Sequence, residues 1–336
     1  MNLVTGGTGL VGAHLLLHLL QKGEKVRAIY RSEKNIQKTK RLFKDLGHQN
    51  LFPEIEWVLG DVTDIPSLEN AFKDVSYVYH CAAFISFDSK DEDLLRKINI
   101  EGTANMLHCA LHFGVTKFCH VSSIAALGDP LGNNLEIDEN NEWNPEKYHS
   151  DYGLTKYGAE MEVFRAQQEG LNCVIVNPGV ILGLGFWNSG SGKIFKSVSK
   201  GIPFYTNGSS GFIAVEDVVQ QMYSLMKSDS SNERFILVAE NIPYISLLNW
   251  IAEGMNTKKP SFKIGSIATK LLSKLNSFFS FFGITKIGIT KDLAFSLHNS
   301  TLYSNKKIKT FTNPDFKSIE AYTKFIASKY AFYRDF

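Results

Sequence analysis

Tyrosine and lysine side chains four residues apart could together carry out proton transfer. A helix places such a pair on one face, and an ammonium group close to a phenol lowers the phenol's pKa from its ordinary value of about 10. The stretch DYGLTKYGAE, residues 151–160, offers Tyr152 and Lys156 at this spacing. The same spacing recurs at Tyr30/Lys34, Tyr223/Lys227 and Tyr303/Lys307. Spacing alone therefore selects no pair, and the elements around each pair must decide.

The composition is that of an ordinary globular protein. The chain has 336 residues, 44% hydrophobic and 21% charged, enough for one large domain or a domain with an appendage. Its formal net charge of +2 gives no electrostatic basis for binding nucleic acid. The four cysteines form no CxxC pair, which favours a reduced, cytoplasmic protein. We find no signal peptide pattern and no run of about 18 apolar residues that would predict a transmembrane helix.

Short β-branched runs alternate with helical patterns through the first half of the chain. The predicted strands are 3–5, 25–30, 56–59, 75–80, 118–122 and 173–177, and the predicted helices are 10–21, 34–46, 67–72, 94–113 and 152–168. This alternation predicts an α/β fold with a doubly wound parallel sheet. We assign residues 1–180 to this domain, with 212–240 returning to it. Residues 181–211 and 241–336 are expected to form a smaller, mainly helical C-terminal substrate lobe.

A glycine-rich turn follows the first predicted strand. Residues 3–12 read LVTGGTGLVG, in which Gly6, Gly9 and Gly12 recur at intervals of three. Glycine permits the tight turn, lets backbone N–H groups approach a pyrophosphate, and allows the helix to pack on the strand. Because the turn lies at the first strand–helix junction, it predicts a dinucleotide-binding site.

The end of the second predicted strand indicates which dinucleotide binds. An acidic residue there takes the ribose 2′-hydroxyl, whereas an arginine accommodates a 2′-phosphate. The sequence reads KVRAIYRSE and places Arg31 at this position, with Glu33 slightly late. This favours NADP(H). In the alternative interpretation Arg31 is a solvated surface residue and NAD is the cofactor.

These motifs resemble those of the extended short-chain dehydrogenases/reductases, which have a Rossmann fold. TGGTGLVG is similar to the family's TGxxGxxG, and GDVTD carries the Asp61-Val62 pair that the resemblance places at the adenine. HCAA, residues 80–83, stands where the family has an NAA-like turn, with Cys81 in place of the usual Asn. KINIEGT, VSSIAALG and NPGVILG follow in the family's order, so that the resemblance covers residues 1–220.

The resemblance selects one tyrosine–lysine pair, because only Tyr152 and Lys156 open the helix after a serine-bearing strand end. It implies that Tyr152 is the general acid and that Lys156 lowers the pKa of Tyr152 and holds the nicotinamide ribose. Ser123 would bind the substrate oxygen, and Asn99 would support the lysine through water. The residues implied for cofactor binding are Gly6, Thr8, Gly9, Leu10, Val11, Gly12, Arg31, Asp61, Val62, Cys81, Ala82, Ala83, Tyr152, Lys156, Pro178, Gly179 and Val180.

Two reaction types divide the extended family: nucleotide-sugar epimerases or dehydratases, and carbonyl reductases such as dihydroflavonol reductases and hydroxysteroid dehydrogenases. Nucleotide-sugar enzymes commonly carry an Arg just before the segment that here reads GFIAVEDVV, but Ser210 and Gly211 occupy that place. A substrate diphosphate would be poorly compensated. The residues expected on the substrate side suit an apolar or aromatic ligand: Phe84, Ile85, Ser86, Phe87, Trp143, Phe186 and Trp187.

We therefore favour an NADP(H)-dependent reductase of a small apolar or aromatic ketone or aldehyde, either a monomer or a homodimer. A nucleotide-sugar epimerase or dehydratase is the alternative. A third hypothesis, from a different class, is a dinucleotide-binding regulator without catalysis, but such members usually lose the Tyr or the Lys.

Two further patterns have several interpretations. His108 and His112 have a spacing that can bind a metal, but no third ligand lies near in sequence, so we expect surface histidines and no metal. Residues 264–282 place Ile264, Ile267, Leu271, Leu275, Phe278 and Phe282 on one helical stripe. This segment could be a core-facing helix of the lobe, a lid over an apolar substrate, or a helix on a membrane surface.

Overall fold

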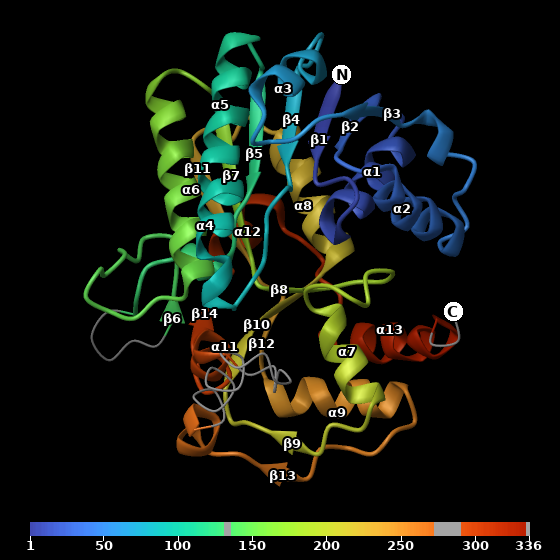
Figure 1. The fold of residues 1–336 in the computed structure, drawn as a ribbon, viewed down its shortest axis with the longest axis vertical. Helices are drawn as coiled ribbons and strands as arrows, with labels where there is room; N and C mark the ends of the chain where they lie inside the picture. Colours follow the sequence, from blue (N-terminus) through green and yellow to red (C-terminus); the bar gives the residue numbers. More distant parts are fainter. Residues whose placement is uncertain (131–135, 272–289, 334–336) are drawn as a thin grey trace.

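A seven-stranded sheet forms the centre of the molecule in the computed structural model, which describes residues 1–130, 136–271 and 290–333 (Figure 1). The strand order is β11-β7-β5-β4-β1-β2-β3, and every neighbouring pair is parallel. In chain order the strands are β1 (Asn2–Thr5), β2 (Val26–Tyr30), β3 (Glu56–Leu59), β4 (Tyr77–His80), β5 (Lys117–Val121), β7 (Cys173–Pro178) and β11 (Glu233–Leu237). The order reverses between β1 and β4, the point at which such sheets bind ligands.

Helices cover both faces of this sheet, as the sequence predicts. Successive strand residues point to opposite faces: Val4 belongs to one buried cluster, with α1, α2 and α8, whereas Leu3 belongs to another, with α3, α5 and α6. These helices are α1 (Leu10–Gln21), α2 (Glu33–Asp45), α3 (Ile65–Ala71), α5 (Gly102–His112), α6 (Asp151–Gln168) and α8 (Val215–Lys227). The fold is therefore a doubly wound α/β fold of the Rossmann type.

The helix predicted over 94–113 is interrupted. The structure has α4 (Glu92–Leu95), then a π-helical segment (Arg96–Glu101), and then α5. A π-helical turn inserts an extra residue into the helix and changes the direction in which nearby side chains point. Asn99 lies within this segment.

The C-terminal lobe contains helices and several short strands that the sequence did not indicate. The three-stranded sheet consists of β8 (Val180–Leu182), β10 (Ser209–Ala214) and β12 (Glu240–Pro243). Two smaller pairs join β9 (Phe204–Tyr205) to β13 (Phe262–Lys263), and β14 (Leu302–Tyr303) to β6 (Glu136–Ile137). The helices of the lobe are α7 (Gly192–Ser199), α9 (Tyr244–Gly254), α11 (Lys291–Ser296) and α13 (Ile319–Tyr333). Helix α12 (Lys306–Thr312) instead packs on β11 and α8, since Phe311 lies against Phe235 and Thr312 donates to Gln221. A third buried cluster lies among α7, α9 and α13.

The stripe predicted over 264–282 is only partly visible. Residues 266–271 are helical, and the remainder of the segment, 272–282, lies outside the described residues. Among the helices that the structure describes, none has the length and hydropathy to cross a bilayer.

Candidate active site

The glycine-rich turn between β1 and α1 is closed so tightly that side chains would not fit in it. Gly6 has φ +68°, a conformation that favours glycine. The N–H of Gly9 donates to the carbonyl oxygen of Gly6 at 2.9 Å. A Cβ on Gly12 would lie 2.2 Å from that same oxygen. The backbone N–H groups at the start of α1 are thus open to a phosphate group, as a dinucleotide requires.

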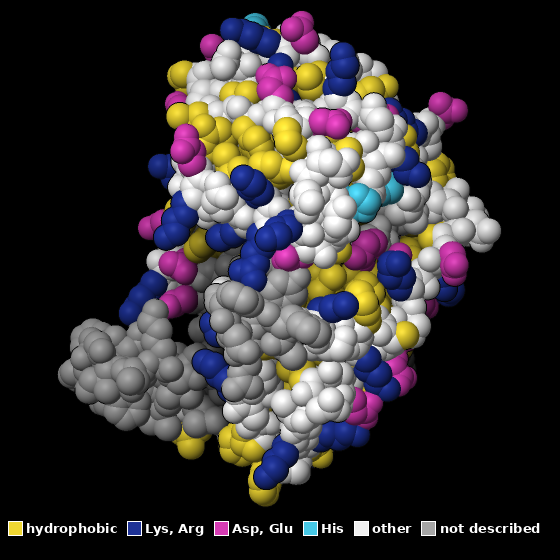
Figure 2. Space-filling view, turned by 90° about the vertical axis from the view of Figure 1, so that its right-hand side faces the viewer, with side chains coloured by type: hydrophobic (Ala, Val, Ile, Leu, Met, Phe, Trp, Pro, Cys, Tyr) yellow, Lys and Arg dark blue, Asp and Glu magenta, His cyan; other side chains and the backbone are white. Residues whose placement is uncertain are grey.

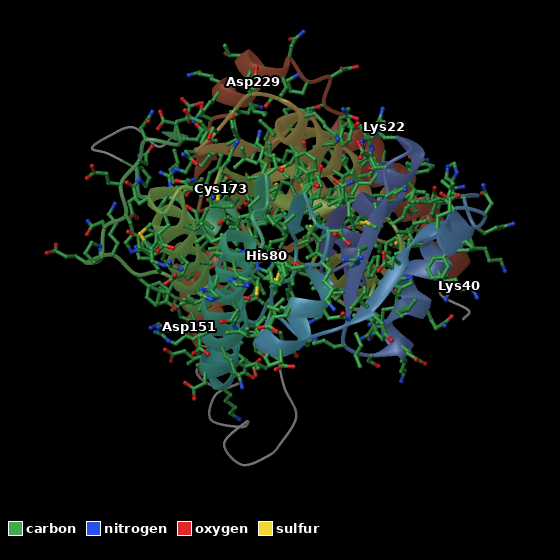
Figure 3. The ribbon with its side chains drawn as sticks, turned by 90° about the horizontal axis from the view of Figure 1, so that it is seen from above. Lys22, Lys40, His80, Asp151, Cys173 and Asp229 are labelled. Atoms are coloured by element: carbon green, nitrogen blue, oxygen red, sulfur yellow. The ribbon has the colours of Figure 1, made fainter. Side chains whose placement is uncertain are left out.

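The turn after β4 lies directly against this glycine-rich turn. A Cβ on Gly6 would come within 2.8 Å of the backbone of Cys81 and Ala82. The N–H of Ala82 donates to Thr5 Oγ1 at 3.0 Å, and the same oxygen lies 2.8 Å from Nδ1 of His80. His80 lies in the middle of the sheet in the view from above (Figure 3). These bonds fix the ends of β1 and β4 side by side, where the predicted cofactor residues from both meet.

Arg31 lies at the end of β2, where the sequence predicts contact with the cofactor's ribose. Its side chain is 62% exposed and its Nη1 lies 3.8 Å from Oδ2 of Asp61. The other oxygen of Asp61 accepts hydrogen bonds from the N–H and hydroxyl of Thr63, both at 2.9 Å. Val62 is buried under Gly102. Arg31 and Asp61 therefore form a polar pair where the chain leaves β2 and β3.

Ser123 and Tyr152 meet at the end of β5 and the start of α6. Ser150 caps α6 by accepting the N–H of Gly153 at 3.1 Å, and a Cβ on Gly153 would lie 2.9 Å from the carbonyl oxygen of Ala125. The helix start is thus pressed against the loop after β5. Burial raises the pKa of Tyr152 to about 12, and a hydrogen bond with the Ser123 side chain opposes this rise. The phenol keeps its proton at neutral pH, as a general acid must.

Lys156 is buried one turn further along α6. Its side chain is 2% exposed, and its Nζ donates to the carbonyl oxygen of Val121 at 2.8 Å. Burial lowers the pKa of Lys156 to about 8, while Glu160 and Cys81 oppose that shift. We predicted that the lysine would lower the pKa of Tyr152. In the structure, burial has the largest effect on the pKa of Tyr152, and the group that opposes the rise is Ser123.

Glu160 is a site residue that our sequence reasoning missed. It is fully buried, and one carboxylate oxygen accepts from Ser122 Oγ at 2.5 Å and from Asn177 Nδ2 at 2.6 Å. The other oxygen lies 3.4 Å from Nη1 of Arg234. Glu160 therefore links α6 to the ends of three strands directly behind Lys156. The i, i+4 spacing of Lys156 and Glu160 was a signal in the sequence that could have found it.

Asp292, on α11 of the lobe, is the second residue that sequence reasoning missed. Its Oδ2 accepts the N–H of Asp151 at 3.2 Å, and its Oδ1 accepts the Tyr148 hydroxyl. Asp151 precedes Tyr152, so a lobe residue helps to hold the start of the helix that carries the tyrosine. Residues 141 positions apart make this contact, and no local pattern indicates it.

The Asn99 amide is held by the chain after β4 and by α6. Its Oδ1 accepts the N–H of Phe84 at 2.8 Å, and its Nδ2 donates to the Phe84 carbonyl and to Thr155 Oγ1, both at 3.0 Å. These bonds use the amide to fix the chain after β4 against α6. Asn99 therefore positions the predicted substrate segment, and its support of Lys156 through water stays a prediction.

The predicted substrate side is only partly as expected. Ile85 is 52% exposed, and the ring of Phe87 lies 6.2 Å from the ring of Tyr152, centroid to centroid. Ser86 donates to Asp91 Oδ2 at 2.5 Å, which occupies its hydroxyl. Phe186 departs from the prediction, because it is 7% exposed and belongs to the buried cluster of the lobe.

The two tryptophans expected on the substrate side pack mainly against other rings. Trp143 stacks between His149 and Tyr157, with centroid distances of 3.7 and 4.4 Å. Trp187 packs edge-on against Phe195 and Tyr330 in the lobe.

Pro178 ends β7, and Gly179 and Val180 follow it, where the chain passes from the sheet to the lobe. The N–H of Gly179 donates to the carbonyl oxygen of Leu237 at 3.0 Å, and Val180 begins the pairing of β8 with β10. A Cβ on Gly179 would lie 2.3 Å from the carbonyl oxygen of Gly211. This junction therefore holds the lobe at the carboxyl ends of the central strands.

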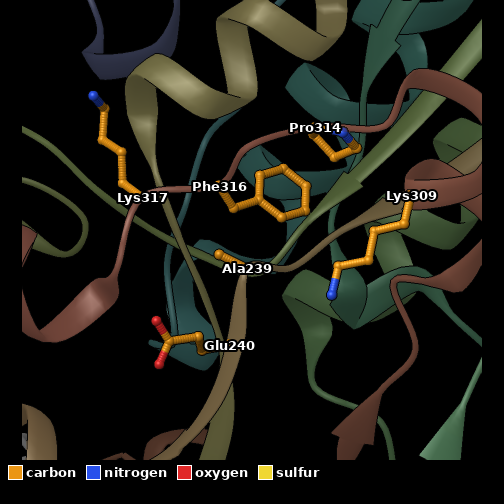
Figure 4. Close-up of a pocket in the computed structure, with 6 residues that line it drawn as sticks. All are labelled: Ala239, Glu240, Lys309, Pro314, Phe316 and Lys317. Atoms are coloured by element: carbon orange, nitrogen blue, oxygen red, sulfur yellow. The ribbon is translucent and has the colours of Figure 1, made fainter.

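Other features of the described chain lie apart from this site. His108 and His112 are exposed, and no group of three or more His, Cys, Asp or Glu side chains in the described ranges could hold a metal ion. A surface cavity of about 240 Å³ is lined by Ala239, Glu240, Lys309, Pro314, Phe316 and Lys317 (Figure 4). None of these six residues is a predicted site residue.

The fold and the arrangement of Ser123, Tyr152 and Lys156 define the class of NAD(P)-dependent short-chain dehydrogenases/reductases. The chain belongs to the NAD dependent epimerase/dehydratase family, whose model matches residues 2–238.

Three similar proteins show the range of this family. A protein of Synechocystis sp. named as a dihydroflavonol 4-reductase is 34% identical over 253 residues, 73% of this chain and 69% of that protein. A UDP-glucose 4-epimerase of Vibrio cholerae is 28% identical over 250 residues, 71% of this chain and 70% of that protein. The crystal structure of gox2253 has a TM-score of 0.80 at 25% identity and covers 100% of this chain and 98% of its own.

The lowered pKa of Lys156 predicts an unusual alkaline limit of activity. The kcat/KM of an enzyme reports the pKa values of its free form. If the charged ammonium holds the cofactor, as the resemblance implies, kcat/KM should be full well below pH 8 and fall as the pH rises through about 8, where Lys156 loses its proton. A pH profile from 6 to 10 measures this limit, with circular dichroism confirming that the fold persists. A limit near 10.5, the ordinary lysine value, would contradict the prediction.

Proposed function

We propose that this protein is an NADP(H)-dependent reductase of a small apolar or aromatic ketone or aldehyde. The observation that carries the proposal is the position of the Phe87 ring beside Tyr152, with Ile85 exposed in the same segment. An apolar wall next to a protonated phenol suits a carbonyl group attached to an apolar body. The reductase name of the Synechocystis relative supports the same reading.

The residues of the site support a simple division of roles. When bound, the nicotinamide supplies a hydride to the carbonyl carbon. Tyr152 donates its proton to the oxygen that becomes negative, and the hydrogen bond with Ser123 orients the phenol toward that oxygen. Lys156, held by the carbonyl oxygen of Val121, presents its ammonium to the ribose and stabilises the phenolate that remains.

A nucleotide-sugar epimerase or dehydratase is the second candidate, favoured by the 28% identity to the Vibrio cholerae epimerase. Two residues within β10 support it less well. Ser210 is buried, and Gly211 packs against Val238 and Tyr303, where a Cβ would already be 2.6 Å from Val238. No basic side chain is provided at these two positions for a diphosphate.

One screen separates the two candidates. NADPH consumption would be measured with aromatic ketones, aldehydes and sterol ketones, and UDP- and GDP-sugars would be tested in parallel for conversion. Stoichiometric NADPH oxidation with a carbonyl compound is the expected result. Conversion of nucleotide sugars alone would overturn the proposal, and saturable NADPH binding without any turnover would favour a non-catalytic regulator.

Arg31 should determine the preference for NADPH over NADH. Its guanidinium follows β2, is 62% exposed and can take a 2′-phosphate by a charge-assisted hydrogen bond. Replacing Arg31 with alanine should weaken NADPH binding by about 10- to 100-fold, since such bonds contribute about 1.5–3 kcal/mol. NADH binding should change little.

Dissociation constants from the quenching of protein fluorescence measure this effect. The matched control is Arg41→Ala, which removes an arginine from the exposed side of α2. Equal losses of NADPH and NADH affinity in Arg31→Ala would contradict a specific phosphate contact.

A further inference from the structure

The end of the lobe farthest from the central sheet exposes several large apolar side chains. Strands β9 and β13 lie there (Figure 1). Phe204 is 47% exposed and Phe262 is 63% exposed, and their rings lie 6.3 Å apart. Five residues after Phe262, Ile267 is 84% exposed, and Leu271 is 59% exposed. We call these four residues, together with Lys258, Lys263 and Lys270, the basic end face.

The helical turn 266–271 presents its apolar residues outward. Thr269 is the residue of this turn that is buried, at 1% exposure, and its hydroxyl lies 2.8 Å from Nε2 of His298. Ile267 and Leu271 point to solvent instead. Of the interpretations of the 264–282 stripe, a core-facing helix does not fit these described positions.

The stretch of sequence that contains this face carries charges of one sign. Residues 254–291 contain seven lysines and no Asp, Glu or Arg, a formal charge of +7, which leaves −5 for the rest of a chain whose total is +2. Lys258, Lys263 and Lys270 are exposed beside the apolar residues. Figure 2 shows hydrophobic and basic side chains together at this lower end of the molecule.

Apolar and basic side chains on one exposed face are the combination that binds an anionic lipid surface. Phenylalanine and leucine enter the boundary between headgroups and acyl chains, and lysines attract the negative headgroups. A second copy of the chain would place like charges against each other across a symmetric contact. We propose that the basic end face docks the protein on membranes that contain anionic lipid.

The basic end face is also linked to the start of the tyrosine-bearing helix. The basic segment ends at α11, whose Asp292 accepts the N–H of Asp151 at the start of the tyrosine-bearing helix. Thr269 of the exposed turn lies 2.8 Å from His298, two residues past α11, so the turn and the start of the tyrosine-bearing helix both contact the α11 region.

Vesicle sedimentation with the full chain tests this proposal. The probes are vesicles of phosphatidylcholine alone and vesicles of phosphatidylcholine with phosphatidylglycerol. We expect binding to the anionic vesicles only, and we expect high salt to weaken it by screening. The double variant Lys263→Ala/Lys270→Ala should weaken partitioning by about 30-fold, since each lysine near such a surface contributes about fivefold. Phe262→Ser/Ile267→Ser should also lose most of the binding.

Matched controls remove the same chemistry elsewhere on the surface. Lys40→Ala/Lys44→Ala removes two exposed lysines from α2, at the periphery of the other half (Figure 3), and Leu59→Ser removes an exposed leucine from β3. Both should bind vesicles like the unaltered protein, and every variant should retain NADPH binding.

Three results would overturn the proposal: no preference for anionic vesicles, an equal loss in the Lys40/Lys44 control, or a Phe262/Ile267 variant that changes only the oligomeric mass. The last would instead identify this face as a contact between copies of the chain.

Discussion

Replacing Tyr152 with phenylalanine is expected to lower kcat for carbonyl reduction by about 10²- to 10⁴-fold, the usual contribution of a positioned general acid. The substitution removes the proton that Tyr152 would give to the substrate oxygen and leaves the ring in place beside Phe87. Because the phenol is protonated at neutral pH, with a pKa raised to about 12 by burial, the loss should persist across the working pH range.

Steady-state kinetics with NADPH, together with a separate titration of NADPH binding, measure this effect. Tyr157→Phe is the matched control on the same helix, because the Tyr157 ring stacks on Trp143 and its hydroxyl has no proposed role. Control turnover should be close to that of the unaltered protein. Turnover of Tyr152→Phe within threefold of the unaltered protein would refute the assignment.

Replacing Glu160 with alanine is expected to lower the free energy of unfolding by about 3–5 kcal/mol, the usual cost of removing one partner of a buried ion pair. The substitution leaves Arg234 without its carboxylate and removes the acceptor of Ser122 and Asn177. It also removes a negative charge that raises the pKa of Lys156. The alkaline limit of activity should therefore move to lower pH in the milder variant Glu160→Gln.

Urea unfolding followed by circular dichroism measures the change in stability. Glu162→Ala is the control, since Glu162 lies on the same helix but pairs only with the half-exposed Arg165, which costs less than about 1 kcal/mol to lose. If both alanine variants lose the same stability, Glu160 has no special role in holding α6 to the sheet.

The central sheet and the phosphate-binding turn could be predicted from the sequence because their signals are local. The run Cys173–Pro178 is buried on both faces and therefore reads as a continuous apolar strand. The glycine turn is visible because Gly12 is required by a contact with the backbone of Gly6, and Gly6 by its own φ of +68°. Strand and helix boundaries in the first half mostly agree with the predicted ranges to within a few residues.

The rest of the site depends on contacts that are distant in sequence. Asn99 lies in a π-helical segment, and its amide contacts Phe84 and Thr155. The helical pattern over 94–113 predicts neither the segment nor these contacts. Phe186 is apolar whether it lines a substrate or fills a core, so that composition could not exclude its burial in the lobe. Asp292 reaches α6 from the far end of the chain.

Strand β11 has a consequence for how this protein is made. The chain leaves the sheet after β7, builds part of the lobe, and returns with β11 to pair along β7 from Glu233 to Leu237. During translation the sheet therefore cannot be completed until residue 237 has left the ribosome. A fragment ending at residue 180 would expose the hydrogen-bonding edge of β7, and such an edge pairs readily with other molecules. A fragment that holds the complete central sheet must therefore extend at least to residue 237, and it carries with it the part of the lobe that lies between β7 and β11.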